Sequence, residues 1–124
     1  MLDRCVFRNE AVMTVAIATR LDQIRKFAGV SAREVAQLLN TTPETVSRWR
    51  TGRTEPQPDR RDNLLRLEWL VTELADLFPP EEAKLWLFSH HKRLDGQRPA
   101  DLIMQGRTEE VLRIIAQLKD GAYV

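Results

Sequence analysis

Residues 31–53 carry the feature that most constrains the fold, which is a pair of short helical signals separated by a tight corner. Ser31 and Glu34 have the spacing of a capping box, in which each side chain satisfies a backbone N–H at the start of a helix. Thr42 is a good cap for a second helix, and Pro43 suits its first position because that N–H has no partner within the helix. We therefore predict a helix-turn-helix, a shape that can place its second helix in a DNA groove.

The side chains of this motif divide into an apolar inner face and a polar outer face. The inner face consists of Val35, Ala36, Leu39, Val46 and Trp49. Asn40 and Gly52 suit the left-handed conformation that ends a helix. The outer face of the second helix carries groups that bind base edges and phosphates, namely Glu44, Thr45, Ser47 and Arg48. The alternative is an ordinary helical hairpin whose polar face is only solvated.

The small residue at Ala36, the apolar residue at Val46 and the aromatic residue at Trp49 resemble the Xre/Cro helix-turn-helix family. This resemblance implies that DNA lies nearest to Thr42, Pro43, Glu44, Ser47 and Arg48. With Thr45 from the outer face and Arg53, which follows the motif, these residues complete the predicted DNA-binding set.

Charge is distributed unevenly between the two halves of the 124-residue chain, although its net charge is only +1. Residues 14–53 carry seven basic and three acidic side chains, a net of +4, whereas residues 59–124 carry ten basic and twelve acidic side chains, a net of −2. The positive field thus lies where phosphate attraction would need it. Because the excess is small, we expect DNA binding by a dimer that presents two such surfaces.

Composition indicates a globular protein of the cytoplasm. Hydrophobic residues make up 43% and charged residues 30%, which is unlike a disordered chain. Cys5 is the only cysteine, so a disulfide framework is excluded and a reducing compartment is expected. No apolar run is long enough to span a membrane, and no signal peptide opens the chain.

We predict an all-α fold with two regions. Residues 1–13 have no helical period and are expected to be a disordered tail; Met13 as the native start and a genuine tail beginning at Met1 are both consistent with this. A helix over 15–27 and the helix-turn-helix form the region 14–53. The prolines of 54–58 favour an extended linker to the region 59–124.

A long helix from Arg60 to Phe78, capped by Asp59, is expected to be the centre of the second region. Its core-facing seam is Leu64, Leu67, Val71, Leu74 and Phe78. A second apolar set, Leu65, Trp69, Leu70 and Leu77, widens the apolar surface beyond that seam. This set is a candidate assembly interface with a second copy or another protein, and burial within the chain itself is the alternative.

Three further helices are expected after this one. They begin near Pro80, at Pro99 and after Thr108, which would cap the last helix, and a polar loop over 89–98 separates the first two. Gly121 is expected to end the last helix.

The segments 82–87, 94–102 and 106–111 resemble the toxin-binding domain of Xre/MbcA/ParS-like antitoxins. With the helix-turn-helix, the likeness covers about residues 15–124. It implies a partner toxin with a RES domain that consumes NAD⁺ or transfers a group from it. The antitoxin would hold this toxin inactive in a toxin–antitoxin heteromer. It also implies toxin contacts by the C-terminal end, Asp120, Gly121, Ala122, Tyr123 and Val124, with Arg107 shaping the contact. His90, His91 and Lys92 depart from the family pattern at the start of the loop.

No catalytic or metal site is predicted, and no cofactor. The sequence lacks nucleotide-binding, hydrolase and zinc-protease motifs. His90 and His91 are adjacent, so their side chains diverge, and we expect a solvated loop there. Trp49, Trp69 and Trp86 are expected in apolar packing, with Trp69 the closest to an interface.

Three functions are compatible with the sequence. The first is an antitoxin that neutralises a RES-domain toxin and represses its own operon. The second is a stand-alone dimeric helix-turn-helix transcription regulator. The third is an antitoxin whose helix-turn-helix no longer contacts DNA.

Overall fold

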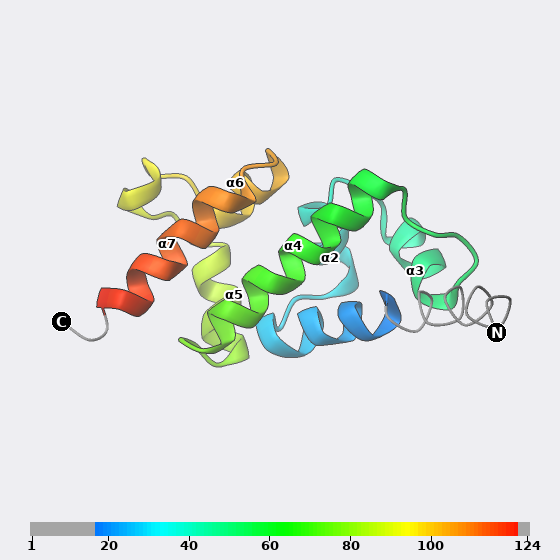
Figure 1. Cartoon of the computed structure of the whole chain (residues 1–124), viewed down its shortest axis with the longest axis horizontal. Coiled ribbons are helices and arrows are strands. Elements are labelled where there is room, and N and C mark those ends of the chain that lie inside the picture. Colours follow the sequence, from blue (N-terminus) through cyan, green and yellow to red (C-terminus); the bar gives the residue numbers. More distant parts are fainter. Residues whose placement is uncertain (1–16, 122–124) are drawn as a thin grey trace, which may run out of the picture.

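The computed structural model describes residues 17–121, and every regular element in that range is helical, as predicted (Figure 1). The first described helix covers residues 17–28. The others are α2 (Ala32–Leu38), α3 (Pro43–Thr51), α4 (Pro58–Ala75), α5 (Pro80–Leu87), the 3-10 turn η1 (Lys92–Leu94), α6 (Pro99–Met104) and α7 (Thr108–Gly121). The predicted tail, Met13 and residues 122–124 lie outside the described range.

Two predicted helix starts are wrong by a few residues. The long helix α4 begins at Pro58 rather than Arg60, with Gln57 in the cap position instead of Asp59. The physical reason is that Pro58 already has the helical φ and no N–H to satisfy. The helix also ends earlier, at Ala75 rather than Phe78. The second wrong start is that of α7, where Thr108 is a buried first residue of the helix and not its cap.

A single hydrophobic core connects the first described helix to α7. α4 supplies its largest share, with Leu64, Leu67, Leu70, Val71 and Leu74 buried. Ion pairs join the two halves around this core: Arg20 binds the carboxylate of Glu68 at 2.8 and 2.9 Å, and Lys84 lies 3.3 Å from Glu34. The two predicted regions therefore share one core.

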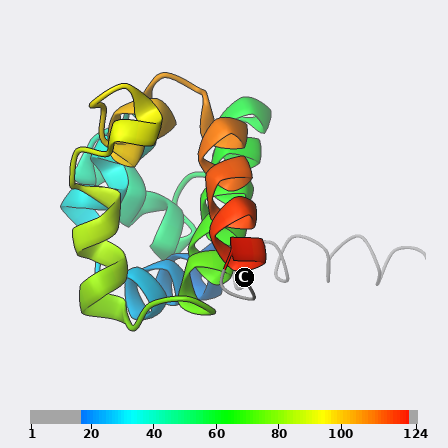
Figure 2. The same ribbon diagram turned by 90° about the vertical axis from the view of Figure 1, so that its left-hand side faces the viewer.

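The helices place the two candidate surfaces far apart. α7 packs along α4, and α6 bridges α7 and α2. In Figure 2, α7 runs beside α4 while α5 lies on the other side of the molecule. Figure 1 shows α3 and the C-terminal end of α7 at opposite ends of the long axis of the molecule. One chain can thus present both surfaces at the same time.

Candidate DNA-binding and partner-binding surfaces

The helix-turn-helix forms with the predicted caps. Ser31 Oγ accepts from the backbone N–H of Glu34 at 3.2 Å, and Ser31 N–H donates to Glu34 Oε1 at 2.8 Å. Thr42 Oγ1 accepts from the backbone N–H of Thr45 at 3.2 Å. Gly52 ends α3 at a φ of 79°, where the absence of a Cβ removes the strain. The capping box, the second cap and the terminal glycine are all confirmed.

The predicted DNA-binding residues gather on the outer surface of α3. Val46 and Trp49 are buried beneath the helix. Thr42, Pro43, Glu44, Ser47, Arg48 and Arg53 are exposed, and Thr45 is half-buried. Thr45 and Arg48 also border a polar groove of about 350 Å³ whose other wall includes Arg60 from α4. An exposed arginine beside hydroxyl groups suits phosphate and base-edge contacts.

The turn before α3 is held by residues that sequence reasoning missed. Asn40 adopts the left-handed conformation at a φ of 55°, as expected. Its amide nitrogen donates to the carbonyl oxygen of Met104 at the end of α6, at 2.7 Å. Arg60 donates to the carbonyls of Leu39 and Asn40, the latter at 2.6 Å. A guanidinium at the carbonyl end of α2 is stabilising because the helix dipole is negative there. Arg60 thus fixes the corner from which α3 starts.

Arg107 and Asp120 lie at opposite ends of α7. Arg107 directly precedes the helix and Asp120 follows Arg107 by 13 positions, which corresponds to about 20 Å along the helix. Arg107 is exposed and forms a two-pronged ion pair with Glu110, with one N–O distance of 2.8 Å. Hydrogen bonding to Glu110 raises the pKa of Arg107 and lowers that of the Glu110 carboxyl. A partner that uses both Arg107 and the tail has to run along the whole helix.

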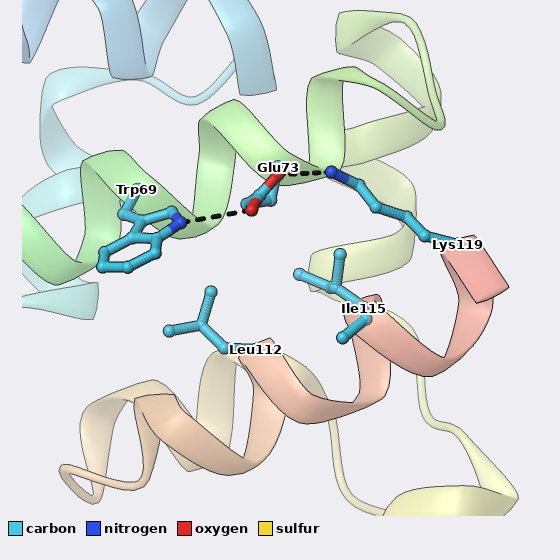
Figure 3. A pocket seen from close by; sticks show the side chains of 6 residues that line it. Trp69, Glu73, Leu112, Ile115 and Lys119 are labelled. Carbon is cyan, nitrogen blue, oxygen red and sulfur yellow. Dashed lines mark hydrogen bonds and ion pairs between the residues drawn. The ribbon is translucent and has the colours of Figure 1, made fainter.

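An α4–α7 groove of about 220 Å³ lies next to the C-terminal end of α7 (Figure 3). It is lined by Trp69, Glu73, Leu112, Ile115, Ala116 and Lys119. Trp69 is 62% exposed, and its indole N–H donates to Glu73 Oε1 at 3.2 Å. Lys119 closes one end of the groove by binding Glu73 and, at 2.9 Å, Asp76. The hydrogen bond that Lys119 donates to Glu73, and after it the bond to Asp76, raises the pKa of Lys119. The bond from Lys119 also lowers the pKa of Glu73.

The predicted assembly set divides between surface and core. Trp69 is well exposed and Leu65 is 36% exposed, so both can meet a partner. Leu77 is half-buried. Leu70 is wrong as an interface residue, because its side chain is 0% exposed within the core. The 3.6-residue period of α4 turns Leu70 inward beside Val71, and sequence spacing alone did not separate it from Trp69.

The predicted solvated loop over 89–98 is also tied to its surroundings. The His90 ring nitrogen Nδ1 lies 2.7 Å from the carbonyl oxygen of Gly96, and the His91 Nε2 lies 2.9 Å from that of Trp86. The rings of Trp86 and His91 are 5.1 Å apart. Leu94 is buried beneath the loop. His90 is exposed, as expected for a solvated loop, whereas His91 is half-buried, and both ring contacts to backbone carbonyls add a structural role that was not predicted.

Comparison with known proteins gives these surfaces a context. A model of the antitoxin Xre/MbcA/ParS C-terminal toxin-binding domain matches residues 73–121, and a helix-turn-helix model matches residues 21–60. The probable mycobacterial cidal antitoxin Rv3188 of Mycobacterium tuberculosis is 37% identical over 123 residues, which cover 99% of this chain and 96% of that protein. The chain belongs to the Xre/MbcA/ParS antitoxin family. It is accordingly not an enzyme.

Other members of this family extend the likeness. The mycobacterial cidal antitoxin MbcA of M. tuberculosis is 31% identical over 96 residues, covering 77% of this chain and 85% of MbcA. A crystal structure of the M. tuberculosis MbcT–MbcA toxin–antitoxin complex contains a similar chain, with a TM-score of 0.75 and 29% identity. That match covers 86% of this chain and 96% of the other. The match to the family's toxin-binding domain therefore spans the last residues of α4 together with α5, η1, α6 and α7.

Two further observations concern the described residues 17–121 only. None of their helices combines the length and apolar character that a membrane span requires. Nor do three histidine, cysteine or carboxylate side chains in this range come together as a metal site would need.

Proposed function

We propose that this antitoxin binds and neutralises a RES-domain toxin that consumes or transfers from NAD⁺, and that it represses its own operon through the helix-turn-helix. One observation carries the proposal: a helix-turn-helix match over residues 21–60 and a toxin-binding-domain match over residues 73–121 occur in one chain. The similar MbcA chain is part of a toxin–antitoxin complex with MbcT, which supports a toxin partner of the same kind.

The proposed toxin contact is the C-terminal end of α7. Asp120 and Gly121 are exposed in the last turn, and Ala122, Tyr123 and Val124 follow them. An aromatic ring, an aliphatic side chain and a free carboxylate suit a pocket that binds a ring and phosphates. Arg107 belongs to a more distant part of the same contact, since α7 separates it from the tail by about 20 Å.

The proposed DNA contact is the outer surface of α3. Its support is the exposure of Ser47 and Arg48 beside the Thr42 cap, together with the net charge of +4 over residues 14–53. Because this excess is modest, we propose that two copies, alone or within a toxin–antitoxin heteromer, occupy two half-sites of the operator. The division into 14–53, 54–58 and 59–124 then separates DNA-contacting from toxin-contacting sequence.

The test is the effect of the intact chain on the NAD⁺ consumption of its proposed partner, a RES-domain toxin from the same host. Increasing amounts of the chain are expected to reduce the rate to background at a fixed stoichiometric ratio, and the two proteins should elute together. Undiminished NAD⁺ consumption with excess chain would refute the proposed partner. Operator binding without any toxin binding would instead favour a stand-alone transcription regulator.

A further inference from the structure

Trp69 is an exposed aromatic residue that neither the α3 surface nor the tail accounts for. It lies in the middle of α4 and is 62% exposed, whereas Leu67, Leu70 and Val71 are buried and Leu65, one turn earlier, is 36% exposed. The hydrogen bond from the indole N–H to Glu73, at 3.2 Å, orients the ring over the groove. A large aromatic side chain that is oriented before a partner arrives binds with a smaller loss of conformational entropy.

The groove beside Trp69 combines an apolar wall with charged groups at one end. Leu112 and Ile115 of α7 form an apolar wall opposite the indole ring (Figure 3), and Ala116 also lines the groove. At the end closed by Lys119, its single ammonium pairs with two carboxylates, that of Glu73, which lines the groove, and that of Asp76, which lies outside the lining, so one negative charge is left over. The groove therefore suits an apolar side chain that is flanked by a basic group.

The tail is too short to form the whole toxin interface by itself. Residues 120–124 are five residues, whereas a stable protein interface takes about 20–30 residues from each side. The additional contact has to come from surface that adjoins the tail. The α4–α7 groove is such a surface, because Lys119 directly precedes Asp120 and Ala116 lies one turn earlier on α7.

We propose that the α4–α7 groove is the second part of the toxin-binding surface and receives an apolar side chain of the toxin flanked by an arginine or lysine. This inference rests on the proposed function and extends it from the tail to α4. Five of the six groove residues lie within residues 73–121, the part that matches the toxin-binding domain, and Trp69 precedes it by four residues.

Binding of the full-length chain to its RES-domain toxin, measured by calorimetry, tests the proposal with Trp69→Ala and a matched control. Leu85→Ala is that control, since Leu85 is 68% exposed and lies in the same toxin-binding domain, on α5. In Figure 2, α5 lies on the side of the molecule away from α7. We expect Trp69→Ala to weaken toxin binding at least about thirtyfold, as for an interface hot spot, and Leu85→Ala to weaken it less than about threefold. Trp69→Phe should retain most of the affinity.

Several results would overturn the proposal. One is unchanged toxin affinity in Trp69→Ala, and another is an equal loss in Trp69→Ala and Leu85→Ala. A third contradicting result would come from light scattering of the free variants. If Trp69→Ala converted a dimer to a monomer while toxin affinity was retained, the groove would be a contact with a second copy of the chain. Absence of toxin binding by the unmodified chain would instead refute the proposed function, and the groove assignment with it. Circular dichroism establishes that each variant is folded.

Discussion

Arg48 is exposed on α3, one helical turn from the Thr45 side chain and above the polar groove that Arg60 borders. If its guanidinium binds a guanine edge in the operator, Arg48→Ala should weaken operator binding by about 1–3 kcal/mol. Fluorescence anisotropy at constant salt measures this, because protein–DNA affinity depends strongly on salt concentration. Arg113→Ala, an exposed charge on α7, is the control. Unchanged affinity in Arg48→Ala would favour an antitoxin whose helix-turn-helix does not contact DNA.

Individual residues also show where sequence reasoning succeeds and where it ends. Ser31, Thr42 and Gly52 were predictable because caps and left-handed ends depend on residues within one turn. Asn40 was predicted for its backbone conformation, but its bond to Met104 joins residues 64 positions apart. Local sequence carries no signal for such a contact. The same holds for Arg60, whose partners at the α2 end lie on another element.

At the scale of elements, the Glu73–Lys119 ion pair is a pH-sensitive link between α4 and α7. The hydrogen bond from Lys119 lowers the pKa of Glu73 from 4.5, so the carboxylate stabilises the folded state fully above pH 4.5 and loses that contribution as the pH falls through its lower folded value. Glu73→Gln should therefore reduce the free energy of unfolding by about 0.2–1 kcal/mol at neutral pH, because the pair is partly exposed. In acid this difference should disappear.

Urea unfolding of both proteins across this pH range measures the difference. The Lys119→Met background is the control, since Glu73 there lacks its cationic partner on α7. A pH-dependent difference of the same size in that background would contradict the assignment to the ion pair.

The positions of the helices along the chain were mostly predictable from apolar spacing. Which face of each helix is buried was less predictable. The order of helices and the seam Leu64, Leu67, Val71 and Leu74 follow from a 3.6-residue period. That period could not decide which side of so apolar a helix would be covered by α7. Consequently Leu70 was wrongly expected at an interface. Trp69 is 62% exposed, which contradicts its expected apolar packing, and its expected place at an interface stays a prediction.

At the scale of the whole molecule, one continuous core carries two surfaces at opposite ends of the long axis (Figure 1). α3 occupies one end and the last turn of α7 the other, so operator DNA and a toxin need not compete for the same surface. The sequence predicted both regions through family resemblance but not their shared core. That core depends on the packing of α2 against α6 and of α4 against α7, and the partners in each pair are distant in the chain.

The central claim is that toxin neutralisation depends on the C-terminal end of α7. Deletion of residues 121–124 tests it most directly, because the buried core residues described within 17–121 all precede Gly121 and the fold should be retained. We expect the truncated chain to keep its helical circular dichroism and operator affinity while NAD⁺ consumption by the RES-domain toxin is restored. Undiminished inhibition of NAD⁺ consumption by the folded, truncated chain would contradict the claim.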